Sequence, residues 1–485
     1  MTFEIVFVLL SLLGMVAALI ADKMRPGMIL FSVVVLFLCA GILTPKEMLE
    51  GFSNKGMITV ALLFLVSEGI RQSGTLGQVI KKLLPQGKTT VFKAQLRILP
   101  SVAFISAFLN NTPVVVIFAP IIKHWAKSVN LPATKFLIPL SYVTILGGIC
   151  TLIGTSTNLV VHGMILEAGF EGFSMFELGK VGIFIAIAGI IYIFLFSKRL
   201  LPDARPDTAV PDEEVEEGEK LHRVEAVLGA RFPGINKKLK DFNFQRHYGA
   251  EVKEIKTRNG QRFVSNLEEV VLHEGDTLVV MADDTFIPTW GESSVFVLLT
   301  NGNEPDTTGK KKKRWFALLL LVLMIVGATV GELPITKEMF PDIKLDMFFF
   351  VSITTIIMAW TNLFPARKYT KYISWDILIT IACAFAISKA MVNSGVADSV
   401  AKFIIGLSDD YGPHVLLAMV FIITNLFTEL ITNNAAAALA FPLALSISAQ
   451  LGVSPTPFFV VICMAASASF STPIGYQTNL IVQGI

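Results

Sequence analysis

Charged residues are scarce in this chain. Asp, Glu, Lys and Arg make up 16% of the 485 residues, whereas hydrophobic residues make up 53%. This balance is typical of a polytopic membrane protein, because soluble domains carry about 25% charged residues. Cysteine is also rare: Cys39, Cys150, Cys383 and Cys463 all lie in apolar segments without metal-ligand spacing. We therefore predict that all four are packed in the interior, with neither a disulfide nor a metal ion.

Apolar segments long enough to cross a bilayer occur in both halves of the chain. The predicted spans of the first half cover residues 2–20, 28–43, 57–70, 134–153 with 159–165, and 176–196. Those of the second half cover residues 315–330, 345–360, 373–391, and 457–472 with Leu480 onward. The first segment lacks a basic n-region, so we interpret it as a retained span and not a signal peptide. Lys and Arg cluster in alternate loops, which predicts an outside N-terminus and a cytoplasmic insert.

A polar motif pair occurs once in each half, inside apolar sequence. The first copy is Asn110-Asn111-Thr112-Pro113 followed by Gly154-Thr155-Ser156-Thr157-Asn158, and the second is Thr432-Asn433-Asn434-Ala435 followed by Gly475-Tyr476-Gln477-Thr478-Asn479. Asn111 and Asn158 are 47 residues apart, and Asn433 and Asn479 are 46 apart. Polar runs are costly in lipid unless they line a protected site. The matched copies therefore predict a transporter built from two repeats, with its site where the repeats meet.

Two further apolar stretches, residues 98–125 and 414–450, are too long for one span and carry the Asn motifs at their middles. We predict that each forms a re-entrant helical hairpin with the motif at its tip. Thr112 before Pro113 predicts that Thr112 is the N-cap of the second arm and that Pro113 is its first helical residue. The loop 154–158 similarly predicts a half-helix that begins at Leu159. Helix N-termini of this kind suit an oxyanion.

Basic side chains are absent around these motifs. No Lys or Arg occurs between Arg97 and Lys123, between Lys135 and Lys180, or from Phe403 to the last residue. A dianion bound here would have no basic side chain to balance its charge, and a desolvated, unpaired charge is expensive. Bound cations are the expected compensation, and the carbonyl groups of the unwound backbone suit sodium. The pattern therefore predicts sodium symport.

These motifs and the inverted layout resemble the divalent anion/sodium symporters of the larger ion-transporter superfamily. Dicarboxylate carriers of that family have Ser-Asn-Thr at both tips and Pro-Pro-Asn in the broken spans. This chain departs from both patterns and, with its insert, resembles the sulfate-type members. The resemblance implies sulfate as the small divalent inorganic anion, sodium as the coupling ion with no other cofactor, and a homodimer in the lipid bilayer of the plasma (inner) membrane. It also implies elevator-type alternating access.

The resemblance implies the ligands as well. One sodium site would be formed by Ser106, Asn110, Asn111, Gly154 and Asn158. The other would be formed by Thr428, Thr432, Asn433, Gly475 and Asn479. The anion would face Asn111, Thr112, Ser156, Asn433, Asn434 and Gln477.

Between the two halves the composition changes to that of a soluble domain. Strand-like runs cover residues 222–228, 250–256, 277–281 and 295–300, with turn signals at Asn259-Gly260 and Glu274-Gly275-Asp276 and a helix expected near 235–244. The segments Tyr248-Gly249-Ala250-Glu251-Val252 and Leu272-His273-Glu274-Gly275-Asp276 resemble the C-terminal domain of regulators of potassium conductance. That resemblance implies a regulatory domain with an unidentified ligand; the alternative is a cytoplasmic spacer or dimer contact.

The predicted fold class is thus an all-α polytopic membrane protein of two inverted repeats, each with a re-entrant hairpin and a broken span, plus a small α+β cytoplasmic insert. The predicted units are a first transmembrane repeat (residues 1–200), a flexible acidic linker (201–219), a regulatory-type domain (220–305) and a second, inverted repeat (306–485). In the first repeat a full span follows Asn158, whereas the sequence ends at Ile485, six residues after Asn479; we therefore expect that a final span is missing.

Two other functions compete with anion symport. A cation/proton antiporter or arsenite carrier of the same superfamily would use Glu429 as its titrating group, although we favour a structural role for this carboxylate. A ligand-gated potassium channel is suggested only by the insert, and the sequence lacks a TVGYG-like filter. No motif supports an enzyme, and we expect no binding of nucleic acid.

Overall fold

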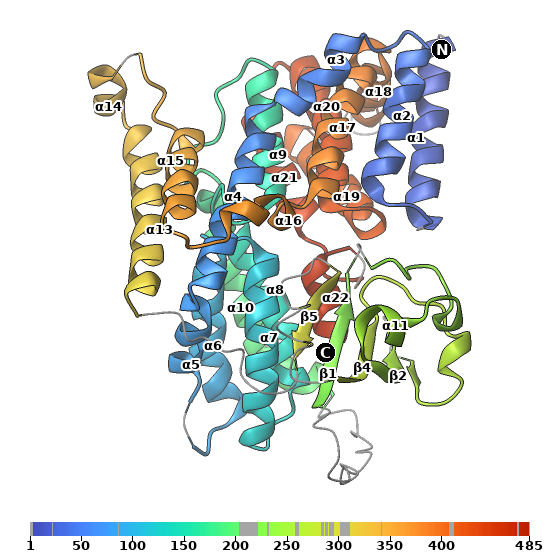
Figure 1. Cartoon of the computed structure of the whole chain (residues 1–485). Coiled ribbons are helices and arrows are strands. Elements are labelled where there is room, and N and C mark those ends of the chain that lie inside the picture. Colours follow the sequence, from blue (N-terminus) through green and yellow to red (C-terminus); the bar gives the residue numbers. More distant parts are fainter. Residues whose placement is uncertain are drawn as a thin grey trace.

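The computed structural model describes residues 3–21, 23–85, 87–202, 222–229, 232–257, 261–282, 286, 290, 295–300, 311–340, 342–406, 412–472 and 475–484. Most of them are helical (Figure 1). Short 3-10 turns, η1 (Gly51–Ser53), η2 (Leu239–Asp241), η3 (Leu267–Glu269) and η4 (Ala366–Lys368), connect longer elements.

The first half contributes ten helices among the described residues. They are α1 (Phe3–Ala21), α2 (Pro26–Cys39), α3 (Pro45–Glu50), α4 (Lys55–Gln72), α5 (Thr75–Leu83), α6 (Val91–Ser106), α7 (Asn111–Ser128), α8 (Thr134–Gly148), α9 (Ser156–Glu167) and α10 (Gly179–Leu200).

The helices of the second half follow the insert. They are α13 (Lys311–Gly331), α14 (Pro334–Met339), α15 (Met347–Trp360), α16 (Tyr369–Tyr372), α17 (Trp375–Asn393), α18 (Val396–Gly406), α19 (Gly412–Leu430), α20 (Asn433–Leu451), α21 (Thr456–Ser467) and α22 (Gln477–Gly484).

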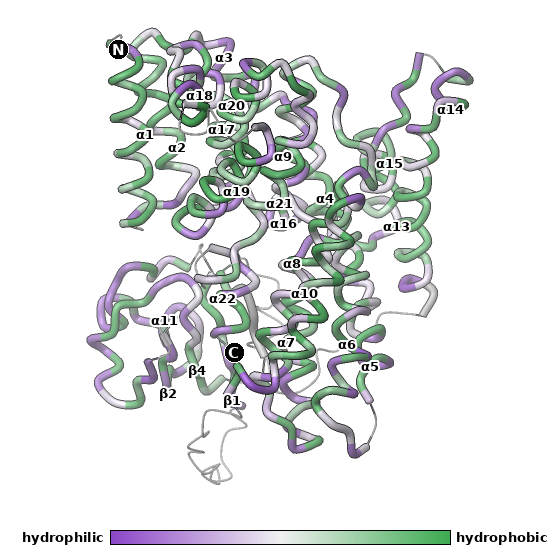
Figure 2. Tube along the Cα trace, turned by 180° about the vertical axis from the view of Figure 1, so that it is seen from behind, coloured by the Kyte–Doolittle hydropathy of each residue, from purple (hydrophilic) through white to green (hydrophobic). Residues whose placement is uncertain are grey.

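The chain is an integral multi-pass membrane protein. Seven helical stretches in the described part are long and apolar enough to cross a bilayer, and shorter apolar helices accompany them. Large apolar side chains on their outer faces remain exposed, among them Leu10, Phe184 and Leu195. Such side chains suit contact with lipid, and Figure 2 shows the hydrophobic residues running along these helices. Cys39 is exposed and Cys150 is half-buried, so the prediction that all four cysteines are interior was wrong for Cys39. All four are free of disulfides.

Both predicted hairpins are present as pairs of helices that break at the Asn motif. In the first, α6 ends at Ser106 and α7 begins at Asn111; in the second, α19 ends at Leu430 and α20 begins at Asn433. Figures 1 and 2 place α6 and α7 in the lower half of the molecule, and α19 and α20 in the upper half. The two tips therefore approach the middle from opposite ends.

Two sequence-based helix starts were misplaced. Helix α7 begins at Asn111 with Asn110 as its N-cap, so Thr112 is not the cap and Pro113 is not the first helical residue. Pro113 is tolerated because the amides of the first turn have no intrahelical acceptor. Helix α9 begins at Ser156 and not at Leu159. In each case the helix extends further into the polar motif than predicted, so the motif itself forms the helix N-terminus.

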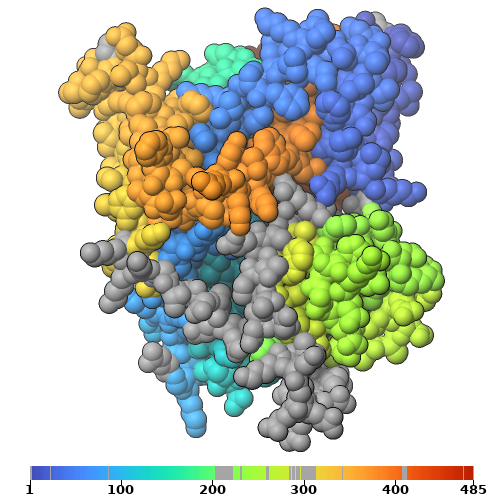
Figure 3. Space-filling model, viewed as in Figure 1, coloured from blue at the N-terminus to red at the C-terminus, as the bar shows by residue number. Residues whose placement is uncertain are grey.

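The insert folds around an antiparallel sheet in the order β3-β2-β4-β1-β5. Its strands are β1 (His222–Leu228), β2 (Glu251–Lys256), β3 (Arg262–Phe263), β4 (Thr277–Ala282) and β5 (Phe296–Thr300). A separate hydrophobic core supports the sheet, and it includes the packed rings of Phe232, Phe244, Tyr248 and Phe296. Figure 3 shows the insert as a green lobe below the N-terminal helices.

Four of these strands match the predicted ones to within a residue, but the short strand β3 was missed. The helix expected near residues 235–244 was wrong, because this segment contains a turn and η2, and the short helix α11 (Phe244–Tyr248) only begins at its end. The Glu274-Gly275-Asp276 turn is present, with Gly275 at a φ of 85° that favours glycine. The Asn259-Gly260 turn and most of the linker lie outside the described residues.

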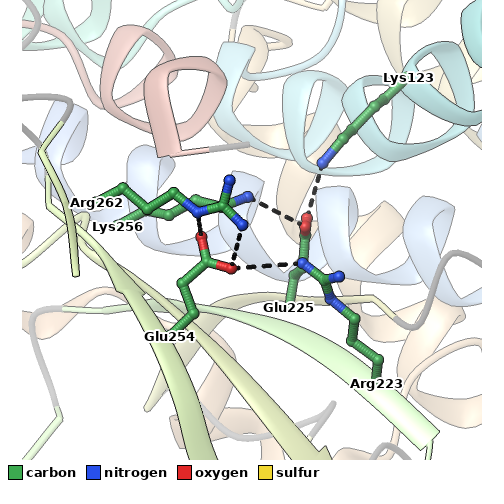
Figure 4. A network of polar contacts seen from close by, with 6 residues as sticks. All are labelled: Lys123, Arg223, Glu225, Glu254, Lys256 and Arg262. Atoms are coloured by element: carbon green, nitrogen blue, oxygen red, sulfur yellow. Dashed lines mark hydrogen bonds and ion pairs between the residues drawn. The ribbon is translucent and has the colours of Figure 1, made fainter. Parts of the chain in front are cut away.

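The insert is docked onto the first hairpin through a partly buried ion pair (Figure 4). Lys123 of α7 donates to Glu225 of β1 at 2.9 Å, and Lys256 of β2 donates to the other oxygen of Glu225 at 3.3 Å. Burial raises the pKa of the Glu225 carboxyl, but Lys123 and Lys256 outweigh this effect and hold the pKa below its ordinary value of 4.5. Edge strand β5 also contacts α7. The insert is therefore attached to the helix whose other end forms the first tip.

We predict that Glu225→Gln destabilises the protein by about 1–3 kcal/mol, because two partly buried ammonium groups lose their charged partner. When the pKa of a carboxyl is lower in the folded than in the unfolded protein, the carboxyl stabilises the fold at every pH above its unfolded pKa. This stabilisation is lost as the pH falls through the folded pKa. Unfolding of the purified protein in detergent should therefore become less pH-dependent below about pH 5 in the variant. Glu251→Gln, at an exposed pair with Lys253, is the control and should change little. Equal effects of the two variants would contradict a stabilising role of the Lys123–Glu225–Lys256 cluster.

Candidate functional site

Four helices begin at the motif residues and meet between the two halves. Helices α7 and α9 begin at Asn111 and Ser156, and helices α20 and α22 begin at Asn433 and Gln477. Helix α7 contacts α22, and α20 contacts α9, so each tip faces the broken span of the other half. No side chain caps α7, α9 or α20 at its N-terminus. Their first-turn amides are therefore not satisfied by a side-chain cap, and the positive ends of the helix dipoles converge on one region.

Two equivalent hydrogen bonds join the halves. The Thr112 hydroxyl, in the first tip, donates to the Gln477 side-chain oxygen at 3.2 Å. The Ser156 hydroxyl, in the first broken span, donates to the Asn434 side-chain oxygen at 3.3 Å. Thr112 and Asn434 occupy the same place in their motif copies, as do Ser156 and Gln477. The same junction between tip and broken span is therefore formed twice.

The asparagines of the two broken spans also make matching contacts. The Asn158 amide donates to the carbonyl groups of Gly148 at 3.3 Å and Thr151 at 2.9 Å. The Asn479 amide donates to those of Ser469 at 2.8 Å and Thr472 at 3.4 Å. In both copies the acceptors lie ten and seven residues earlier in the chain. These asparagines therefore fix the unwound segment that precedes each half-helix.

Glycine is required where each unwound segment folds back on itself. A Cβ at Gly154 would lie 2.4 Å from the carbonyl oxygen of Gly148, and a Cβ at Gly475 would lie 1.9 Å from the hydroxyl of Ser469. Both distances are far below van der Waals contact, so no side chain fits at either position. Gly154 and Gly475 thus allow each unwound segment to pack closely against the residues that precede it.

The tip asparagines have equivalent local partners but different exposure. Asn111 contacts Ser106 at 2.7 Å, and Asn433 accepts from Thr428 at 3.0 Å, in each case five residues earlier. Asn111 is 1% exposed, and its amide also reaches Thr144, Gly154 and, at 2.5 Å, the Tyr476 hydroxyl. Asn433 is only half-buried. The two halves of the site are therefore not equivalent: Asn111 is buried and Thr112 is half-buried in the first tip, whereas Asn433 is half-buried and Asn434 is buried in the second.

Several buried oxygen atoms at the site have no hydrogen-bond partner among the residues that the structure describes. They are Oδ1 of Asn158 and the hydroxyls of Thr432, Ser467 and Ser469. Leaving such groups unsatisfied costs about 1–3 kcal/mol each. Amide, hydroxyl and carbonyl oxygens near unwound helices are the ligands with which secondary transporters hold sodium. The donor set therefore fits a hard monovalent cation on both sides of the junction.

The site contains no basic side chain that could balance an anion. Helices α9, α20, α21 and α22 contain neither Lys nor Arg. Lys123 lies further along α7 and is engaged with Glu225, and the buried Lys135 donates to the carbonyl groups of Lys198 and Leu201. The favourable electrostatics for an anion therefore come from helix N-termini and neutral donors.

Glu429 has a structural role in the described structure. Its carboxylate accepts from the backbone amides of Phe470 at 3.0 Å, Ser471 at 3.1 Å and Thr472 at 2.9 Å. The Thr472 hydroxyl donates to it as well, at 2.8 Å. These four donors occupy the carboxylate oxygens and hold the unwound segment of the second broken span. This arrangement favours the structural interpretation of Glu429 over that of a titrating group for proton exchange.

A small cavity adjoins the first tip. Asn110, Ser156 and Ser67 of α4 line it, together with apolar side chains of α4, α13 and the loop before α7. It therefore lies between the first tip, the start of α9 and the helices α4 and α13.

The structure brings most predicted site residues together. Asn111, Thr112, Ser156, Asn434 and Gln477 meet at the junction, whereas Asn110 faces the cavity. Asn158 and Asn479, with Gly154 and Gly475, shape the two unwound segments. Sequence reasoning missed four residues with direct contacts: Ser141, Thr155, Ser469 and Tyr476. Two of these, Thr155 and Tyr476, lie inside the quoted motifs, and Ser469 lies in a polar run just before one.

Comparison with known proteins points to transport. The family described as citrate transporter matches residues 16–450 and again residues 343–485. An uncharacterized transporter of Synechocystis is 29% identical over 93% of this chain and 87% of that protein. A putative sulfur deprivation response regulator of Chlamydomonas reinhardtii is 27% identical over 94% of this chain and 92% of its own length. Sodium/sulfate cotransporter 1 of the same alga is 33% identical over 59% of this chain and 32% of that protein.

We predict that Glu429→Gln lowers the stability of the protein by about 1–3 kcal/mol, because the amide NH₂ cannot accept from the backbone amides that the carboxylate now serves. The measurement is thermal unfolding in detergent. Glu177→Gln, at a more exposed pair with Lys180, is the matched control and should cost less than about 1 kcal/mol. An unchanged unfolding temperature for Glu429→Gln would contradict the structural role.

Proposed function

The chain belongs to the citrate transporter family and is an anion transporter, and we propose that it is a sodium-coupled carrier of a small divalent oxyanion, with sulfate as the substrate. The convergence of four helix N-termini on a junction without Lys or Arg carries this proposal. It gives an anion hydrogen-bond donors and favourable dipoles, but no full positive charge.

The anion is proposed to bind at the junction between the two tips and the two broken spans. Thr112, Ser156, Asn433, Asn434 and Gln477 surround this junction, and all carry hydroxyl or amide groups. Neutral donors of this kind suit the oxygens of a tetrahedral oxyanion. Asn111 is proposed to hold the junction in place without contacting the anion directly, because its amide is already hydrogen-bonded to Tyr476 and to backbone carbonyl groups.

Sodium supplies the missing positive charge in this proposal. One ion would lie beside Asn158, whose Oδ1 has no hydrogen-bond partner, with Ser106, Asn110, Asn111 and Gly154 as its proposed surroundings. The other would lie on the matched side, where the hydroxyls of Thr432 and Ser469 have no partner, with Thr428, Asn433, Gly475 and Asn479 around it. An unbalanced dianion is expensive in this environment, so anion binding and cation binding should be mutually dependent.

The proposal extends to how the molecule moves. We treat the two halves as inverted repeats, supported by the duplicated contacts of Asn158 and Asn479 and by the duplicated junction. The hairpins and broken spans would move together as one body in elevator-type alternating access, within a homodimer. The insert would lie in the cytoplasm and move with α7, to which Lys123 attaches it.

Uptake of radiolabelled sulfate into proteoliposomes tests the proposal. An inward sodium gradient should drive accumulation, whereas an equal potassium gradient or a proton gradient should not. Unlabelled citrate, the substrate in the family's name, serves as the competitor. Uptake that follows protons and not sodium would replace the proposal with an antiporter-type mechanism, and uptake of citrate in place of sulfate would overturn the choice of anion.

We predict that Asn433→Ala reduces the apparent affinity for sulfate or sodium by about ten- to hundredfold, since the loss of a hydrogen bond to a charged ligand costs about 1–3 kcal/mol. Asn111→Ala should impair transport to a similar degree and should also lower the unfolding temperature, because four neighbouring groups lose a partner. Asn393→Ala, on α17 and bonded to Glu47 and the Ile42 carbonyl, is the control. Normal sodium-dependent uptake by both site variants would remove the tips from the binding site.

A further inference from the structure

We propose that Tyr476 is the specificity-determining residue that limits the site to small oxyanions. This inference rests on the proposed function and adds to it a physical reason for the choice of substrate. It starts from a difference between the two motif copies. In the first copy Gly154 is followed by Thr155, and in the second Gly475 is followed by Tyr476. A short side chain and a large ring therefore occupy matched positions.

The ring of Tyr476 lies inside the site and not in lipid. Its side chain is 8% exposed, and it stands between Gly475, where no Cβ fits, and Gln477, which reaches across to Thr112. The matched residue, Thr155, is 2% exposed and lies within hydrogen-bond distance of it. Two equivalent positions of the two copies thus touch each other, and only one of them is filled by a ring.

Two hydrogen bonds fix the position of the ring. The Tyr476 hydroxyl lies 2.5 Å from the Asn111 side-chain amide and 3.0 Å from the Thr155 hydroxyl. Asn111 is itself held by Ser106 and by the carbonyl groups of Thr144 and Gly154. A tyrosine side chain has few rotatable bonds. With its hydroxyl anchored to two buried groups, the ring cannot easily move aside for a longer ligand.

The two tip asparagines, which occupy matched positions, differ in exposure. Asn111 bonds to Tyr476 of the other half and is 1% exposed, whereas Asn433 bonds to Thr428 of its own half and remains half-buried. The groups left accessible are Thr112, Ser156, Asn433 and Gln477, which lie around the junction. If the second copy had a threonine at this position, as the first copy does, there would be space beside Asn111; the ring of Tyr476 fills that space. A compact tetrahedral anion needs only the remaining space, whereas an extended dicarboxylate or a tricarboxylate would need both sides.

The hydroxyl itself is not the anion ligand in this account. It donates to the Asn111 oxygen, and its own oxygen faces the Thr155 hydroxyl, so both of its roles are filled. The effect of Tyr476 on selectivity therefore comes from the volume of the ring, while the hydroxyl keeps the ring in place. Removing the hydroxyl and removing the ring should consequently have different results.

The experiment uses the full chain in proteoliposomes, with Tyr476→Phe, Tyr476→Leu and Tyr476→Thr compared with the parent. Sodium-dependent uptake of labelled sulfate is measured against increasing succinate or citrate. Tyr476→Phe should reduce sulfate affinity by about 2–10-fold through the lost hydrogen bond and should retain exclusion of the carboxylates. Inhibition by succinate or citrate should strengthen from Phe to Leu to Thr, by about tenfold or more at Thr, in the range by which pocket size discriminates ligands.

Tyr142→Phe is the control, because Tyr142 is a nearby tyrosine whose hydroxyl donates to the Phe470 carbonyl at 2.8 Å. It should leave carboxylate inhibition unchanged. Sulfate uptake by the parent together with unchanged carboxylate exclusion in Tyr476→Leu and Tyr476→Thr would overturn the role of Tyr476 alone. If Tyr476→Thr does not fold, the comparison of Phe with Leu decides. Absence of sodium-dependent sulfate uptake in the parent would instead refute the proposed function itself.

Discussion

The structure depends on satisfying polar groups in the middle of a membrane protein without a basic side chain. Backbone amides and carbonyls that are free at helix ends cannot be left in lipid, so they must face protein, water or a ligand. Here four helix N-termini supply the donors and two unwound segments supply the carbonyl groups. An anion and cations are complementary to these two kinds of group. The same broken helices thus create the need for ligands and the means to bind them.

The two motif copies share one set of hydrogen bonds, and the residues that differ between them make the two halves of the site unequal. Asn158 and Asn479 secure their segments through matched carbonyl groups, and the two junction hydrogen bonds are equivalent. Glu429 has no acidic counterpart in the first copy, where Ala107 takes its place and the Thr151 hydroxyl bonds to the Ala107 carbonyl. Tyr476 similarly replaces a threonine. These substitutions stabilise one half without disturbing the common backbone plan.

The sequence was sufficient for the helices, the hairpins and the motif pair, because apolar length and matched spacing are visible in one dimension. It placed the start of α7 two residues too late, since Pro113 was interpreted as the first helical residue although the helix begins at Asn111 with Asn110 as its N-cap. It also missed Tyr476 and Ser469. Their importance arises from contacts with Asn111 and from the lack of a partner, and both depend on how distant segments pack. Strand β3, with two residues, is too short to leave a pattern.

The central claim is that cations balance the anion at a site without basic residues. The most direct measurement is the equilibrium affinity of the purified protein for sulfate at increasing sodium, with choline keeping the ionic strength constant. Linkage requires that sulfate affinity rise with sodium and that sodium affinity rise equally with sulfate. The account predicts this reciprocal increase at constant pH. Sulfate affinity that is independent of sodium, or that follows pH instead, would contradict it.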